Sequence, residues 1–167
     1  MVSPVLQIKE TLGSPVFHLE VARPGPALDS FLGTLTVQWM PAPGRIAAGD
    51  GVVLVPIGPS IFLYLGAAPA AGAFAVEIEV SGGWTRLVIA GPAATRLLAK
   101  GCALDLHPSR FPPGSCAAAG FARLRTIIWR PEQDQFHMLV GRSYARALWD
   151  WLAEAAAEFD VVAGVTA

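Results

Sequence analysis

Residues 84–101 read Trp84-Thr-Arg-Leu-Val-Ile-Ala-Gly91-Pro92-Ala-Ala-Thr-Arg-Leu-Leu-Ala-Lys100-Gly101. Apolar and polar side chains alternate over 84–90, which is typical of a half-buried strand. Gly91-Pro92 then indicates the start of a helix, because a proline in the first helical turn lacks only an N–H that would have no partner there. The segment therefore predicts a strand followed at once by a helix.

That helix is expected over 93–100. Its spacing places Ala94, Leu97 and Leu98 on one side, which we expect to be buried. Gly101 is expected to end the helix in the left-handed conformation that favours glycine.

A second helix is predicted over 143–159, with Ser143 as its N-cap. Its apolar side chains recur at i, i+4 and i+7 and share one face; they are Tyr144, Leu148, Trp151, Leu152, Ala155 and Phe159. Trp149 lies off this stripe, toward the polar side. It is either an aromatic at the edge of the core or an anchor for a partner, because tryptophan is enriched at protein interfaces.

The remaining pattern predicts short strands separated by Pro and Gly turns. The strands are expected at 16–21, 35–39, 52–55, 62–65, 74–80, 122–129 and 135–140, with a brief helix at 27–32, a loop at 107–120 and a turn at Gln133-Asp134. From 74 onward the order of strands and helices predicts an α+β fold, an antiparallel sheet with helices packed on it in ferredoxin-like layers. We expect a single domain over 1–167, strand-rich over 1–80 and α+β over 81–160.

The composition favours a chain that buries surface against a partner. Hydrophobic residues make up 53% of the 167 residues and charged residues only 15%, against about 25% in a typical soluble protein. With a net charge of −1 and no run of Lys or Arg, the chain lacks the electrostatic footprint of a nucleic-acid binder. We expect protein partners and no nucleic acid, and we expect the isolated chain to self-associate.

Residues 51–76 carry no charge and are long enough for a membrane span. Prolines and glycines divide this stretch into pieces of a few residues, which favours buried strands over a helix. No signal sequence precedes it, and the two cysteines, Cys102 and Cys116, match neither a disulfide framework nor a zinc knuckle. The expected location is the cytoplasm, without a membrane anchor.

No pattern for catalysis, metal binding or nucleotide binding stands out. A nucleophilic Cys116 would need a nearby histidine and a family signature, and we expect a small buried hydrophobe instead. Asp105 and His107 come nearest to metal-ligand spacing, although such a loop is more often a hydrogen-bond station after a helix. Glu77 and Glu79 share a strand face, as a solvated edge or a salt-bridge site would. No glycine-rich phosphate loop follows a strand. We therefore expect no catalytic, metal-binding or cofactor-binding residues in this chain.

Two blocks of sequence carry a family resemblance. The first is 91–106, from Gly91-Pro92 to Asp105-Leu106, and the second comprises Arg142-Ser-Tyr-Ala145, Leu148-Trp-Asp-Trp-Leu152 and Glu154-Ala-Ala-Ala-Glu158. In this order and separation, the blocks resemble the gamma subunit of heterotetrameric sarcosine oxidase. With the strands between them they cover about half of the chain. Ala118-Ala119 and Ser60-Ile-Phe62 depart from that family's pattern, so the partner or the substrate of the assembly is expected to differ.

The family is in turn similar to the folate-binding aminomethyltransferase of glycine cleavage, whose motifs correspond here to Glu79-Val-Ser81, Gly91-Pro92 and Asp105. Residues 116–128 contain no carboxylate, whereas the enzymes carry an acidic pair that addresses folate and amine. The resemblance thus implies the aminomethyltransferase domain fold without its catalytic loop.

The resemblance implies a non-catalytic structural and assembly subunit of a flavin-dependent complex that oxidatively demethylates sarcosine or a related secondary amine. The one-carbon unit would pass to tetrahydrofolate, and FAD, FMN and NAD would be held by other subunits. The alternatives are a stand-alone folate-dependent aminomethyltransferase-like protein and a folate-like ligand-binding module. Candidate interface residues are Lys100, Asp105, Arg123, Arg142 and Trp149, whose charged members could equally form structural salt bridges.

Overall fold

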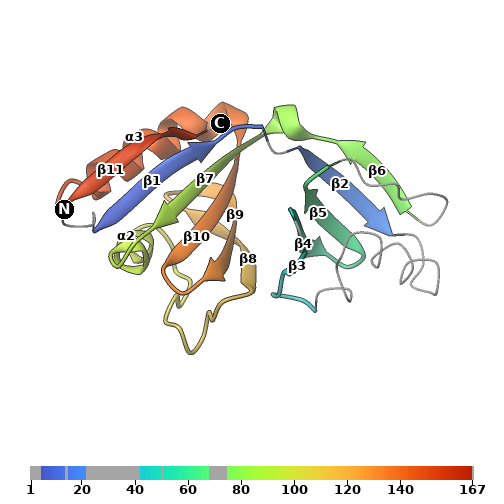
Figure 1. Cartoon of the computed structure of the whole chain (residues 1–167), viewed down its shortest axis with the longest axis horizontal. Coiled ribbons are helices and arrows are strands. Elements are labelled where there is room, and N and C mark those ends of the chain that lie inside the picture. Colours follow the sequence, from blue (N-terminus) through green and yellow to red (C-terminus); the bar gives the residue numbers. More distant parts are fainter. Residues whose placement is uncertain (1–4, 14, 22–41, 50, 68–74, 167) are drawn as a thin grey trace. The chain divides into compact units, whose positions relative to one another are not determined.

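The computed structural model describes residues 5–13, 15–21, 42–49, 51–67 and 75–166. The chain folds into two compact units, one formed by Met1–Gly13 with Gly83–Ala167 and the other by Ser14–Gly82. Figure 1 shows the elements of both. The strand predicted at 35–39 and the helix predicted at 27–32 lie outside the described residues.

The first unit is built on a six-stranded sheet in the order β11-β1-β7-β10-β9-β8. Its strands are β1 (Leu6–Thr11), β7 (Trp84–Ala90), β8 (Ser115–Phe121), β9 (Leu124–Glu132), β10 (Gln135–Gly141) and β11 (Val161–Thr166). Neighbours pair antiparallel except β1 and β11, which run parallel. In Figure 1 these strands lie side by side with α3 (Ala145–Ala155) alongside β11 and β1.

One hydrophobic core joins the sheet to both helices. Leu97 and Leu98 of α2 (Ala94–Ala99) and Leu148 and Leu152 of α3 share a buried cluster with alternate residues of β1, β7, β9 and β10. Because successive strand side chains point to opposite faces, α2 and α3 cover the same face of the sheet. The predicted α+β fold, an antiparallel sheet with helices packed on it, is confirmed.

The second unit is a five-stranded antiparallel sheet in the order β3-β4-β5-β2-β6. Its strands are β2 (Val16–Val21), β3 (Ala47–Gly49), β4 (Val52–Gly58), β5 (Ile61–Leu65) and β6 (Ala75–Glu79). Residues 51–65 thus form strands, as the density of Pro and Gly predicted. No helix over the described residues is long and apolar enough to cross a membrane.

The role predicted for Gly101 is wrong. It is not among the glycines with positive φ, so the helix does not end in a left-handed cap. A Cβ at this position would come within 2.5 Å of the ring of Phe121, a fully buried side chain. Glycine is needed here for the close approach of α2 to the end of β8.

The predicted boundaries and apolar face of the last helix need correction, and α3 ends at Ala155 and not at residue 159. A short 3-10 turn, η3 (Arg142–Tyr144), precedes α3, and the cap position is Tyr144 without a side-chain cap, so Ser143 is not the N-cap. Tyr144 is 54% exposed and therefore not part of the buried face. Trp149 is half-buried and packs against the core. Its row with Leu152, Ala153 and Ala156 follows the i, i+3, i+4, i+7 spacing of a second apolar edge.

Candidate functional site

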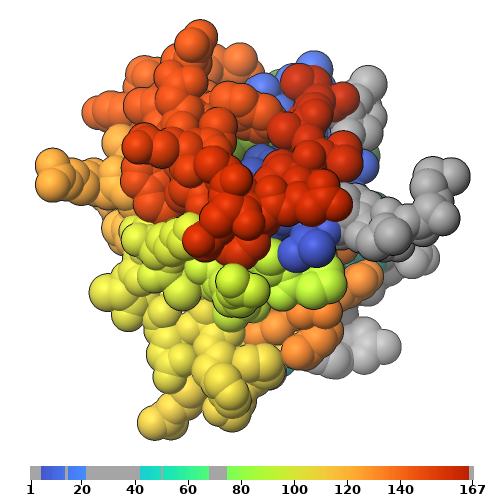
Figure 2. Space-filling view, turned by 90° about the vertical axis from the view of Figure 1, so that its left-hand side faces the viewer, coloured from blue at the N-terminus to red at the C-terminus, as the bar shows by residue number. Residues whose placement is uncertain are grey.

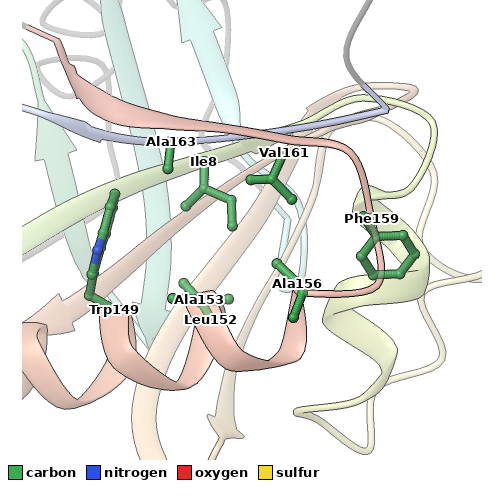
Figure 3. Close-up of a pocket in the computed structure, with 9 residues that line it drawn as sticks. Ile8, Trp149, Leu152, Ala153, Ala156, Phe159, Val161 and Ala163 are labelled. Atoms are coloured by element: carbon green, nitrogen blue, oxygen red, sulfur yellow. The ribbon is translucent and has the colours of Figure 1, made fainter.

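A groove of about 320 Å³ runs between α3 and the strands β1 and β11. Figure 2 shows this side of the molecule, with α3 and β11 in red and β1 in blue. Figure 3 shows how the side chains of α3 point across the groove toward Ile8, Val161 and Ala163. The lining is apolar throughout and comprises Ile8, Trp149, Leu152, Ala153, Ala156, Ala157, Phe159, Val161 and Ala163.

Trp149 stands at one end of this groove and also lines a second cavity. The second cavity measures about 220 Å³ and has polar walls at Glu10, Thr85 and Arg146. The indole thus lines two hollows, and the second is also lined by the apolar side chains of Leu87, Ala145 and Val165. Beyond it, β11 is an edge strand whose Val162 and Val165 are 50% and 62% exposed. An aromatic flanked by hollows next to an open edge is suited to contact a protein partner.

Lys100 forms contacts within the first unit. Its ammonium lies 2.6 Å from the carboxylate of Glu158, donates to the carbonyl of Ala155 at 2.8 Å and lies 4.9 Å from the centre of the Phe159 ring. These contacts join the end of α2 to the end of α3, and an interface at Lys100 stays a prediction.

The other three charged candidates occupy separate surface positions. Asp105 accepts a hydrogen bond from the backbone N–H of His107 at 3.0 Å. Arg123 lies in the two-residue turn between β8 and β9, with φ of 66°. Arg142 in η3 donates to the carbonyl of Trp84 at 3.5 Å.

The five candidate residues do not gather into one patch. The turn that holds Arg123 is tied to the end of α2, because the N–H of Ala122 donates to Gly101, the neighbour of Lys100. Arg142 precedes α3 and Lys100 contacts its last turn, and eleven helical residues separate these ends, which is about 16 Å. Trp149 is the member that lines a groove, and an interface at the others stays a prediction.

The remaining candidates for chemistry have structural partners. Cys116 is buried in β8, and burial raises the pKa of the half-buried Cys102 thiol, which disfavours the reactive thiolate. Glu79 at the sheet edge accepts a hydrogen bond from Ser81. Among the described residues, no three His, Cys, Asp or Glu side chains come together as metal ligands would.

A polar cluster that sequence reasoning did not assemble lies on the face of the six-stranded sheet away from the helices. Arg86 on β7 lies 2.8 Å from Nδ1 of His137 on β10, whose Nε2 lies 2.7 Å from the side-chain amide of Gln135. Because a guanidinium only donates, Nδ1 accepts; Nε2 then carries the ring proton and donates to the side-chain amide of Gln135, assigned with its oxygen toward the ring. Both ring nitrogens of His137 thus lie within hydrogen-bonding distance of a partner.

His137 should make the stability of the chain depend on pH. Burial and the charge of Arg86 lower the pKa of His137 from 6.5 to about 3. The unfolded chain therefore binds this proton below about pH 6.5, whereas the folded chain does so only near pH 3. The contribution of neutral His137 to the free energy of unfolding is fully present above pH 6.5. It declines as the pH falls toward 3, by up to about 1.4 kcal/mol per pH unit.

His137→Gln should remove that component. Urea unfolding between pH 4.5 and 7 should give a shallower loss of stability in His137→Gln than in the unaltered chain. His107→Gln, which changes an exposed histidine outside this cluster, is the control for the loss of a histidine. Equal slopes in all three proteins would contradict a buried neutral His137.

Comparisons with known proteins agree on one family. The family described as "Sarcosine oxidase, gamma subunit family" matches residues 37–158. Sarcosine oxidase subunit gamma of Arthrobacter sp is 30% identical over 146 residues, which cover 80% of this chain and 70% of that protein. The subunit gamma of Corynebacterium sp. (strain U-96) is 29% identical over 150 residues, covering 83% and 73%.

Two solved structures share the fold. One is a chain of the heterotetrameric sarcosine oxidase from Corynebacterium sp. U-96 in complex with pyrrole 2-carboxylate, with a TM-score of 0.84 and 21% identity over 97% of this chain and 89% of that one. The other is the glycine cleavage system aminomethyltransferase T from Bartonella henselae, with a TM-score of 0.65 and 16% identity over 96% of this chain. This chain spans 48% of the aminomethyltransferase.

Proposed function

Because the chain belongs to the sarcosine oxidase gamma subunit family, we propose that it is a non-catalytic structural and assembly subunit of a heteromeric, flavin-dependent sarcosine oxidase-like complex. The observation that carries the assembly role is the apolar groove beside Trp149, bordered by the open edge of β11. A chain with 15% charged residues has surface to bury, and an indole next to an open strand edge offers a partner both an anchor and a pairing edge.

Catalysis is assigned to the other subunits. Residues 116–128 contain no carboxylate, and the charged groups near the two family blocks hold each other or backbone atoms, as Lys100 does with Glu158. The complex would demethylate sarcosine or a related secondary amine and pass the one-carbon unit to tetrahydrofolate. FAD, FMN and NAD would be bound by the partner chains and none by this one.

Both units are proposed to act as one family domain. The family match over 37–158 begins in the unit Ser14–Gly82 and continues through the helices of the other unit. The similarity to the aminomethyltransferase concerns the fold. It therefore provides no residue that would support either alternative, a stand-alone aminomethyltransferase-like enzyme or a folate-like ligand-binding module.

Trp149→Ala should separate assembly from folding. Trp149 is half-buried at the groove, so truncation should cost the isolated chain about 1 kcal/mol. It should weaken association with the partner subunits by about 2 kcal/mol, roughly thirtyfold. Co-purification from co-expressed subunits, followed by sedimentation at graded concentrations, measures the second effect, and urea unfolding measures the first.

Leu148→Ala is the matched control one residue away. Leu148 is fully buried under the helix, so its truncation should cost about 3 kcal/mol of stability. Glu154→Ala, at an exposed position of the same helix that lines neither cavity, should change neither assay. If Trp149→Ala unfolds the isolated chain as readily as Leu148→Ala, or leaves the complex intact, the groove is not the interface.

A further inference from the structure

Two arginines in the first unit are held in contrasting ways. Arg130 is fully buried and directs its N–H groups to backbone carbonyls of Leu106, Phe111, Glu132 and Gln133. Arg86 donates to a single side chain, His137, and its Nε is buried without a partner. The ion pairs Lys100–Glu158 and Arg146–Asp150 do not involve Arg86. Arg130 is therefore structural. Arg86 keeps its positive charge and has one N–H donor without an acceptor.

Neutral groups fix the position of Arg86. His137 accepts from the guanidinium and is itself oriented by Gln135. The ring of Trp129 lies 5.7 Å from Cζ of Arg86 and 5.1 Å from the ring of His137. With a pKa of about 3, the imidazole carries no charge at neutral pH. The cluster is therefore ordered while one full positive charge remains, which is the arrangement of a preformed anion site.

Trp129 supplies a second unused donor. It is 0% exposed, and its indole N–H has no partner among the described residues. Trp129 pairs with His137 across β9 and β10, so the indole and the guanidinium come from strands on either side of the imidazole. A buried tryptophan N–H normally has an acceptor. Arg86 as a whole retains partial exposure, whereas its Nε is buried like the indole N–H.

We infer that Arg86 and Trp129 bind the carboxylate group of a small monoanionic molecule on the face of the six-stranded sheet away from α2 and α3. The Nε–H of Arg86 and the Nε1–H of Trp129 would each donate to one of the two oxygens, and the guanidinium would balance the single charge. A phosphate dianion would bring more charge and more oxygens than two donors and one cation can satisfy. This site does not depend on the assembly proposed above.

Thermal unfolding of the full chain in sodium formate or sodium acetate tests the site, with sodium chloride and sodium phosphate at equal ionic strength as references. Saturable stabilisation is expected with the carboxylates, reaching roughly 3–6 °C at tenfold above the dissociation constant. In ¹H–¹⁵N spectra, one indole N–H signal should move along the same titration. That signal should be the one missing from Trp129→Phe.

The variants decide which groups are responsible. Arg86→Gln and Trp129→Phe should each lower the affinity for formate at least tenfold, and Trp129→Phe retains an aromatic ring if Arg86→Gln folds poorly. Arg125→Gln, which removes an exposed arginine of β9, should bind formate as the unaltered chain does. Three results would each overturn the inference: no response to formate or acetate, an equal response to chloride or phosphate, or an unaltered response in Trp129→Phe.

Discussion

Gly91→Ala is expected to destabilise the chain by about 4 kcal/mol. Gly91 has φ of 113°, a conformation essentially confined to glycine, and strain there costs another residue roughly 1–3 kcal/mol. A Cβ would also lie 2.7 Å from the carbonyl oxygen of Val5. That carbonyl accepts from the N–H of Ala93 at 3.1 Å, so the two chain segments cannot separate without losing the hydrogen bond. Forced separation adds about 1–3 kcal/mol.

Urea unfolding of Gly91→Ala measures this effect, and Gly120→Ala provides the control. Gly120 lies in β8 without a positive φ, and a Cβ added there would meet no other atom within 4 Å. Its replacement should change the free energy of unfolding by less than about 1 kcal/mol. An equally small change in the free energy of unfolding of Gly91→Ala would contradict a tight contact between the backbone of Val5 and the start of α2.

The Gly91-Pro92 pair illustrates what a sequence can and cannot reveal. It correctly predicted a helix start, since α2 begins at Ala94. The reason for glycine, however, is the backbone of Val5, which lies more than eighty positions earlier in the chain. The same limit applies to Gly101, where Phe121 and not a left-handed cap requires glycine. Local rules identify where an element begins, and distant contacts determine which residue is tolerated there.

Strands with local alternation were predicted well, and strands defined by distant pairing were missed. β2 and β7 match the predicted ranges 16–21 and 84–90. β11 pairs in parallel with β1 from the opposite end of the sequence, and no local signal records that. β8 reads Ser-Cys-Ala-Ala-Ala-Gly-Phe, a composition with low strand propensity, and it forms because β9 pairs with it along its whole length.

The polar cluster on the sheet was beyond sequence reasoning for a similar reason. Arg86 and His137 are 51 positions apart, and each sits unremarkably on the polar side of its alternating strand. A signal existed in that alternation, because both residues had to face away from the helices. Only the register of β7 against β10, with Val88 opposite His137, places them within hydrogen-bonding distance.

Arg130→Met is expected to cost about 4 kcal/mol of stability. The guanidinium is fully buried, stacks 4.9 Å from the centre of the Phe136 ring and bonds two separate parts of the chain. On one side it donates to the carbonyls of Leu106 and Phe111, at 3.3 and 2.9 Å. On the other, Nε donates to the carbonyl of Gln133 at 2.8 Å. Methionine fills much of the volume but leaves the carbonyls of the buried residues Leu106 and Phe111 unsatisfied, at about 1–3 kcal/mol each.

Arg130→Lys should recover little of the loss, because one ammonium cannot reach carbonyls on both sides of the planar guanidinium. Urea unfolding measures the change, and Arg125→Met, an exposed arginine on the same strand, should stay within about 0.5 kcal/mol of the unaltered chain. Amide exchange should also become faster at Arg110 and Phe111, whose N–H groups bond the carbonyl of His107 within the loop that Arg130 holds. If Arg130→Met and Arg125→Met unfold alike and the loop exchanges at its former rate, then backbone pairing of β8 with β9 holds this region without the buried cation.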